Sequence, residues 1–163
     1  MESLTPVHVQ AALDALLPGT TIRQFENSTA TSQLAADNIG CELGQIAKSL
    51  AFLIDDQPIL VVASGDQRVD EKKLAALFNV SRKRVKFASA EQCLAIYGYA
   101  PGGMPPVGHR TPGLTILLDD SLRRYDQVYP AGGASNAIFG LKLAELEHIT
   151  GGRFADVRKE AGS

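Results

Sequence analysis

One lysine lies on what the sequence predicts to be a buried face of a strand. The pattern over residues 45–54 indicates a strand, whose side chains point alternately to opposite faces. The more apolar of these faces carries a single charge, Lys48. Its other members are all apolar: Ile46, Leu50, Phe52 and Ile54. Because an unpaired ammonium is expensive to bury, Lys48 must reach solvent, find a partner, lose its proton or line a cavity.

Two interpretations of Lys48 stay open from the residues alone. In the first, the lysine lies near a strand end and its aliphatic stem covers the sheet. In the second, its ammonium points into a substrate pocket. There it would hold a phosphate or a developing negative charge, or act as a Schiff-base amine if it were desolvated.

Two glycine-rich loops supply a second kind of chemistry. The stretch 98–113 is rich in Gly and Pro, and a shorter loop follows at 130–135. Glycine permits close approach of the backbone and proline fixes φ, so such loops are stiff and expose main-chain groups to an oxyanion or a carbonyl. The alternative is a surface crossover. Neither loop fits a phosphate-binding Walker motif or a dinucleotide fingerprint.

Histidines and cysteines give weaker signals. His109 follows Gly108 and is a candidate general base, or a histidine that is merely exposed or hydrogen-bonded. The chain has three scattered histidines and two cysteines, Cys41 and Cys93, with no ligand-like spacing. We therefore expect no metal site, no cofactor and reduced thiols. No Gly-x-Ser-x-Gly elbow supports a serine hydrolase.

The charge balance limits the nucleic-acid partners. Sixteen basic and eighteen acidic residues give a net charge of −2, whereas a protein that wraps duplex nucleic acid carries a strong positive excess. We therefore expect no DNA partner, and any RNA contact to be small. The densest basic cluster is Arg82, Lys83, Arg84 and Lys86. It is either a solvated connection or a phosphate patch.

Targeting signals are not evident in this sequence. It has no run of about 18 apolar residues that would span a membrane. The first twenty residues lack the basic region of a signal peptide. We expect a cytoplasmic protein with no membrane contact, and the sequence leaves the oligomeric state open.

The local patterns predict helices and strands that mix without strict βαβ alternation. Helices are expected over residues 6–17, 32–39, 71–78, 90–97 and 142–149. Strands are expected over residues 20–26, 45–54, 59–64, 84–88, 114–119, 125–129 and 136–141, with a frayed tail after Asp156. No repeat, linker or break in composition divides the chain. We therefore predict one α/β (α+β) domain over 1–163, built around a mixed sheet, some of whose strands close toward a barrel.

Several segments, taken in order, resemble the YbaK/ProX family, the free-standing relatives of the editing domain of bacterial prolyl-tRNA synthetases. The first runs from Thr31 through Ala35 and Gly40 to 44–52. The others are 65–70, the loop 102–109, the strand and loop 128–133, and 143–150. The resemblance covers about residues 20–157. It rests on the order and spacing of these segments rather than on any single motif.

The resemblance implies a trans-editing aminoacyl-tRNA deacylase, an enzyme that hydrolyses the ester of a mischarged tRNA, often tRNA(Pro) carrying a wrong amino acid. It implies a barrel-like sheet surrounded by helices, and it assigns catalytic roles to Lys48 and to the loop with Gly102 and Gly103. The expected substrate-binding residues are Thr31, Ser49, Pro106, Gly108, His109, Gly132 and Gly133. The expected partners are the acceptor CCA end of the tRNA and prolyl-tRNA synthetase.

Two other classes of function remain as alternatives. A binding module of the same fold would hold tRNA or an aminoacyl ligand without hydrolysing it. A small aldolase would use Lys48 as a Schiff-base amine, although no anchor for an aldehyde substrate is visible.

Overall fold

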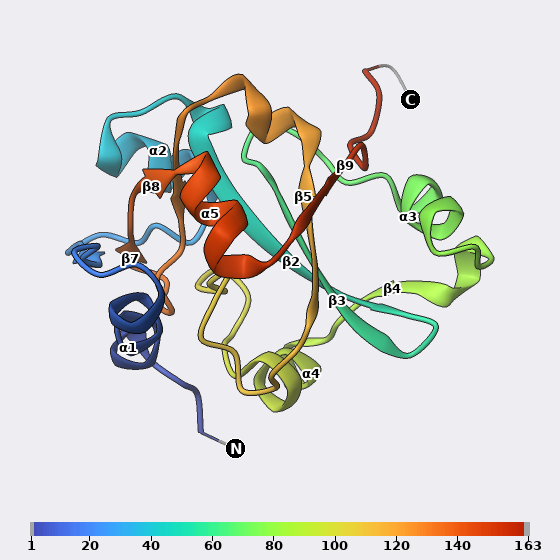
Figure 1. The fold of residues 1–163 in the computed structure, drawn as a ribbon, viewed down its shortest axis with the longest axis horizontal. Coiled ribbons are helices and arrows are strands. Elements are labelled where there is room, and N and C mark those ends of the chain that lie inside the picture. The colour runs from blue at the N-terminus through green and yellow to red at the C-terminus, as the bar shows by residue number, and fades with distance from the viewer. Residues whose placement is uncertain (1, 162–163) are drawn as a thin grey trace.

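The structure is a computed structural model that describes residues 2–161. A strongly curled, mixed sheet forms its centre, with helices around it (Figure 1). The strand order along the main sheet is β8-β6-β2-β3-β5-β9, and β4 pairs with β2 beside this path. Because β8 and β9 lie at opposite ends of this path, the curled sheet does not close and forms a half-barrel. The prediction of a mixed, barrel-like sheet is confirmed.

The helices are α1 (Pro6–Leu16), α2 (Ser32–Ile39), α3 (Glu71–Leu77), α4 (Ala90–Gln92) and α5 (Leu143–Thr150). The strands are β1 (Arg23–Gln24), β2 (Ile46–Ile54), β3 (Gln57–Ser64), β4 (Val85–Phe87), β5 (Thr115–Asp119), β6 (Gln127–Pro130), β7 (Ala137–Ile138), β8 (Leu141–Lys142) and β9 (Arg153–Ala155). Short 3₁₀ turns precede β2, β4 and β6, and a π-helical turn at Cys93–Tyr97 follows α4.

The β2–β3 hairpin is the longest element of the sheet and fixes the register of the rest. Asp55 and Asp56 form its two-residue turn with φ of +50° and +64°, the conformation that matches the twist of paired strands. Ile54 lies opposite Gln57, and the pairing continues to Ala47 opposite Ser64. Every side chain of β2 therefore has a defined face.

Two apolar clusters cover the two faces of the sheet. The larger one lies on the face of Ala47 and Ala51, under α1, α5 and the loop that follows α4. The other lies on the face of Phe52 and Ile54, under α3 (Figure 1). A third, small cluster lies under α2, where Ala35 and Ala36 pack against Ile138 and the start of β2.

The segments 20–26 and 136–141 contain less strand than predicted. Only Arg23 and Gln24 form β1, which pairs with β7 in a separate two-stranded ladder. The second segment is divided because its two halves pair with different strands, β7 with β1 and β8 with β6. Between them the chain passes close to Tyr129 at Gly140, where a Cβ atom would lie 2.8 Å from the tyrosine ring. The prediction of one continuous strand over 136–141 was wrong for this tertiary reason.

The prediction of a frayed tail was also wrong within the described residues. β9 adds to the sheet edge in parallel with β5. Val157 is fully buried, and its N–H donates to the buried carboxylate of Asp119 at 2.9 Å. Lys159 donates its N–H to the carbonyl of Arg68 at 2.7 Å. Residues 157–159 are therefore held against the sheet and against the segment that leads into α3.

No helix among residues 2–161 is long and apolar enough to cross a membrane.

Candidate functional site

The first half of β2 has an unpaired edge. On one side β2 pairs with β3 along its whole length. On the other side β6 pairs with Ile46 and Ala47, and β4 pairs with residues 52–54. Residues 48–50 therefore face a gap between β6 and β4 instead of a neighbouring strand.

The direction of the backbone groups at this gap follows from the register. In an antiparallel ladder, successive residues direct both their N–H and C=O alternately toward and away from the partner. The carbonyl of Ile46 accepts from Gly65 on the β3 side, whereas the carbonyl of Ala51 accepts from Ala88 on the β4 side. Ser49 has the same parity as Ala51. Its N–H and C=O therefore point into the gap, where they can bind a ligand.

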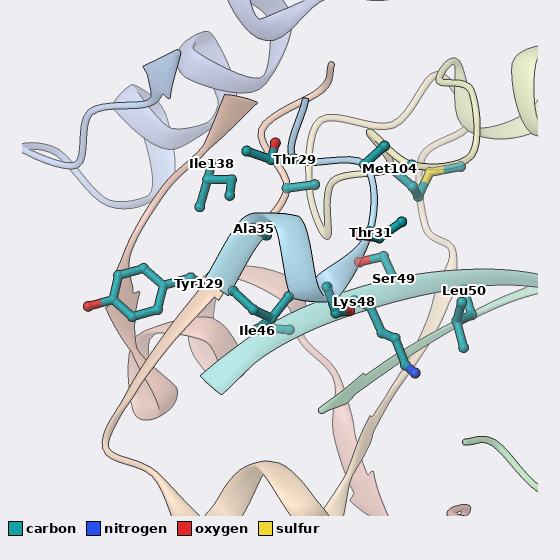
Figure 2. Close-up of a pocket in the computed structure, with 15 residues that line it drawn as sticks. Thr29, Thr31, Ala35, Ile46, Lys48, Ser49, Leu50, Met104, Tyr129 and Ile138 are labelled. Carbon is teal, nitrogen blue, oxygen red and sulfur yellow. The ribbon is translucent and has the colours of Figure 1, made fainter. Parts of the chain in front are cut away.

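A pocket of about 260 Å³ lies in this gap. Figure 2 shows α2 and the segment before it passing over β2, with Met104 and Ile138 on the side of the pocket away from the strand. The lining is mostly small or apolar and comprises Thr29, Ala30, Thr31, Ser32, Ala35, Ile46, Ala47, Lys48, Ser49, Leu50, Gly102, Met104, Tyr129, Ala131 and Ile138. It includes no Asp, Glu or His side chain.

The hydroxyl of Ser49 is an unused polar group in this pocket. Its Oγ is buried and has no hydrogen-bond partner within residues 2–161. In Figure 2 it points toward Thr31. The Oγ1 of Thr31 accepts the N–H of Leu34 at 3.2 Å and so caps α2. A buried hydroxyl without a partner is unfavourable in the empty pocket, so a polar ligand group that bonds to Ser49 would be favoured.

Lys48 lies at the border of the pocket. Its side chain leaves β2 on the opposite side from Ser49 (Figure 2), and its Nζ donates to the main-chain carbonyl of Gln67. Burial lowers the pKa of Lys48 below its usual value, and the nearby carboxylate of Asp66 opposes that shift. The half-buried ammonium has one carbonyl partner and can still accept an anionic ligand.

An ion pair holds the segment that carries this carbonyl. Arg124 donates through both terminal nitrogens to the carboxylate of Asp66, at 2.7 and 2.9 Å. The hydrogen bonds from Arg124 lower the pKa of Asp66. Forked pairs of this kind fix geometry as well as charge. Since Gln67 follows Asp66 directly, Arg124 positions the carbonyl that binds Lys48.

The two glycine-rich loops contact each other, and two neighbouring glycines of the first loop, Gly102 and Gly103, make different contacts. Gly102 lines the pocket with φ +93°, and its N–H donates no hydrogen bond within the described residues. Gly103 packs so closely on the second loop that a Cβ atom would lie 2.7 Å from the carbonyl carbon of Ala134. Its own N–H donates to Ala100 at 3.3 Å, and its carbonyl accepts the N–H of Gly133. Gly102 is therefore the one of this pair with a free amide at the pocket.

The other residues expected to bind substrate lie outside the pocket lining. Pro106, Gly108 and His109 border a different hollow, between the long loop and the ends of α1 and α5. The Nε2 of His109 donates to the carbonyl of Pro105 at 2.7 Å, and burial lowers the pKa of His109. Gly132 and Gly133 are buried where the two loops meet.

The basic cluster at 82–86 does not form one patch. Arg82 pairs with Glu71, whereas Arg84 pairs with Asp55 at the tip of the β2–β3 hairpin. Lys83 and Lys86 are exposed. These acidic partners are distant in sequence, so composition alone does not reveal the division.

Three lining residues were not predicted as site residues. Met104 and Tyr129 lie in segments on which the family resemblance rests, but neither was assigned a role, and Ile138 has the apolar character of an ordinary core position. Of the Asp66–Arg124 pair, only Asp66 belongs to one of the segments on which the family resemblance rests, so the pairing itself could not be predicted. Among the described residues, no group of three or more His, Cys, Asp or Glu side chains is arranged to hold a metal ion.

A family model described as an aminoacyl-tRNA editing domain matches residues 26–149, more than half of the chain. The uncharacterised protein YwhH of Bacillus subtilis is 37% identical over 130 residues, which cover 79% of this chain and 80% of YwhH. EbsC of Enterococcus faecalis, named as a candidate Cys-tRNA(Pro)/Cys-tRNA(Cys) deacylase, is 27% identical over 78% of this chain and 76% of its own length.

Among solved structures, one described as a candidate trans-editing enzyme for prolyl-tRNA synthetase superposes with a TM-score of 0.89 and 35% identity. The match covers 98% of this chain and all of that one. The fold predicted from the sequence and the family resemblance are therefore both confirmed.

Proposed function

This chain belongs to the aminoacyl-tRNA editing domain family, and from that premise we propose that it is a trans-editing deacylase for mischarged tRNA(Pro). In this proposal it hydrolyses the ester between a small, wrong amino acid and the terminal ribose. Prolyl-tRNA synthetase is the partner that forms the mischarged tRNA. The relatives with named activities support the reaction class, since they include a candidate deacylase and a candidate trans-editing enzyme.

The observation that carries the proposal is the pocket at the unpaired edge of β2. Its volume of about 260 Å³ lies below the range of about 300–1,000 Å³ typical of ligand pockets, which suits an amino-acid side chain. Two main-chain amides at this pocket, those of Ser49 and Gly102, have no hydrogen-bond partner among residues 2–161, and the ammonium of Lys48 lies at the border. Such donors can stabilise the negative charge that develops on the carbonyl oxygen of an ester in the transition state.

The proposed reaction uses these groups in order. The amino acid enters the pocket, and its carbonyl oxygen receives hydrogen bonds from the amides of Ser49 and Gly102. A water molecule adds its oxygen to the carbonyl carbon. The bond to the ribose oxygen then breaks, and that oxygen takes up the proton that the attacking water loses. The products are the free amino acid and uncharged tRNA. Because the pocket offers no carboxylate or imidazole, we assign the orientation of the water to the neighbouring ribose hydroxyl of the substrate.

Lys48 has a separate role in this proposal. Its ammonium holds the phosphate of the terminal nucleotide and so fixes the ester beside the amides. Gly103 acts indirectly by allowing the loop to pack on Ala134, which sets the position of the Gly102 amide. Thr31 acts in the same indirect way, by fixing the start of α2 over the pocket.

The test is release of labelled amino acid from a panel of tRNA(Pro) charged with Ala, Ser, Thr, Cys or Pro. We expect hydrolysis of at least one small, wrong aminoacyl ester and none of Pro-tRNA(Pro). The matched control is the same amino acid on its own cognate tRNA, which measures the dependence on tRNA(Pro). If the protein binds these tRNAs but releases no amino acid, it is a binding module and the proposed activity is wrong.

A further inference from the structure

A second hollow lies directly beside the pocket, on the α3 face of the sheet. Its volume is about 540 Å³, and its lining comprises Lys48, Leu50, Arg68, Val69, Asp70, Glu71, Lys72, Arg82, Phe87 and Lys159. We call this hollow the cationic groove. Lys48 and Leu50 line both the pocket and the groove, so the two are neighbours across β2.

The groove concentrates positive charge in a chain whose net charge is −2. Five of its lining side chains are basic and two are acidic. Both acidic groups already have partners. The carboxylate of Asp70 accepts the N–H of Lys72 at 2.9 Å and caps α3, and Glu71 pairs with Arg82. The remaining cations form the small, local footprint that a negatively charged strand requires.

Phe87 adds an aromatic surface to this groove. Its side chain is 57% exposed, an unusual position for a phenylalanine. One side of the ring stacks on the fully buried Phe52, with centroids 4.4 Å apart and planes 28° apart. The buried ring below holds Phe87 in place. An exposed, fixed ring beside cations is the usual equipment for binding single-stranded nucleic acid, in which bases stack and phosphates pair.

We propose that the cationic groove binds the unpaired 3′ end of the tRNA, with one of the two cytidines before the terminal adenosine stacked on Phe87. This proposal rests on the proposed function, because it places the ester in the adjoining pocket. A strand whose terminal phosphate lies at Lys48 continues past Leu50 into the groove. Its next phosphates then lie near Arg68, Lys72 and Lys159.

The stacking part is tested with Phe87→Leu, which keeps an apolar side chain on Phe52 but removes the aromatic ring. Stacking contributes about one order of magnitude in affinity per base. We therefore expect the KM for mischarged tRNA to rise about tenfold with kcat unchanged, and Phe87→Tyr to restore it. The matched control is Val7→Ala, because Val7 is also an exposed apolar residue but lies on α1, outside the groove lining; this variant leaves KM unchanged.

A substrate with an abasic nucleotide shows whether the ring and a base act together. Replacing the stacked cytidine by an abasic nucleotide raises KM about tenfold for the wild type and adds nothing in Phe87→Leu. Each of the two cytidines is replaced in turn. If neither replacement shows this coupling with Phe87, the stacking proposal is overturned.

Binding of uncharged RNA separates this proposal from the proposed function. The probe is a short RNA hairpin ending in single-stranded CCA, measured at several salt concentrations. We expect Lys72→Ala to weaken binding and to reduce its salt dependence by about one phosphate contact, whereas the nearby Lys83→Ala, outside the groove lining, has a much smaller effect. This result can hold even if no ester is hydrolysed. Equal effects of Lys72→Ala and Lys83→Ala would overturn the groove as the RNA site.

Discussion

The two sides of strand β2 differ sharply in chemistry although they are one residue apart. On the side of Ser49 lies a small pocket with apolar walls, a buried hydroxyl and main-chain amides. On the side of Lys48 lies a wider groove with five basic residues and an exposed aromatic ring. This difference explains how a chain of net charge −2 could act on RNA as proposed. In the proposed function, the site that recognises the amino acid and the site that attracts the phosphates lie on opposite sides of this one strand.

The separation follows from the alternation of a strand and from the gap in its pairing. Side chains at 48 and 49 must point to opposite faces. The gap between β6 and β4 leaves the backbone of Ser49 open to the pocket. If a neighbouring strand paired with this edge, it would accept the hydrogen bond of the Ser49 amide and would close the pocket.

The largest expected effect comes from removing the group that both sides share. Lys48→Ala should lower kcat/KM for hydrolysis of the mischarged tRNA by about 10²-fold, because the terminal phosphate is then no longer held and the ester is displaced from the amides of Ser49 and Gly102. Because burial already disfavours the ammonium, the Tm should stay constant or rise slightly. Kinetics and a thermal melt of the same sample check both parts. Wild-type kinetics in Lys48→Ala would remove the lysine from the mechanism.

The next effect tests how Lys48 is held. Arg124→Ala removes the fork to Asp66 and should lower kcat about tenfold, because the carbonyl of Gln67 is then no longer fixed beside Lys48. The matched control is Arg123→Ala. Arg123 pairs with Asp120 and lies over the ring of Phe154, away from both the pocket and the groove. Equal losses in the two variants would show that Arg124 has no positioning role.

The pH dependence of the activity tests whether the positive charge of Lys48 is needed. Burial lowers the pKa of Lys48 below 10.5, so the ammonium is lost at a lower pH than in an exposed lysine. Activity should fall as pH rises through this lowered pKa, and Lys48→Arg should remove the fall while the substrate amine titrates as before. Stability has the opposite sign. The folded state holds this proton less tightly, so the free energy of unfolding gains from Lys48 as pH rises from the lowered pKa toward 10.5. A pH-rate profile for both proteins checks the first part.

The smallest effect concerns the apolar side of the strand. Ile138→Val removes one methylene group from the pocket wall, which costs about 0.5–1.5 kcal/mol of stability. A cavity larger by one methylene should favour a larger aminoacyl group by about fivefold, which corresponds to the lower end of the roughly 1–3 kcal/mol that one methylene is worth in an apolar pocket. Competition between two aminoacyl-tRNAs measures the change. An unchanged ratio would place the amino acid elsewhere.

The sequence predicted the local part of this arrangement and missed the long-range part. The alternation over 45–54 correctly placed Lys48 on one face with Leu50 and Phe52, because it depends only on neighbouring residues. It left open whether the lysine enters a pocket, since the gap beside β2 depends on where β4 and β6 stop. The pairing of β9 with β5 was missed for the same reason.

The candidate site was predictable to a similar extent. Family resemblance drew attention to Lys48 and Gly102, which the structure brings to one pocket. It also drew attention to His109, which lies at a different hollow and donates to Pro105. The exposed Phe87 gave no signal, because its position over Phe52 requires the register between β2 and β4.

One measurement tests directly whether the pocket recognises the amino acid and the cationic groove binds the RNA independently of each other. The ratio of kcat/KM for two aminoacyl groups and the KM for tRNA are determined in Ile138→Val, in Phe87→Leu and in the double variant. We predict that the pocket substitution changes only the ratio, that the groove substitution changes only KM, and that the double variant shows both changes added. A change of the aminoacyl ratio in Phe87→Leu, or a clear departure from additivity, would contradict the separation.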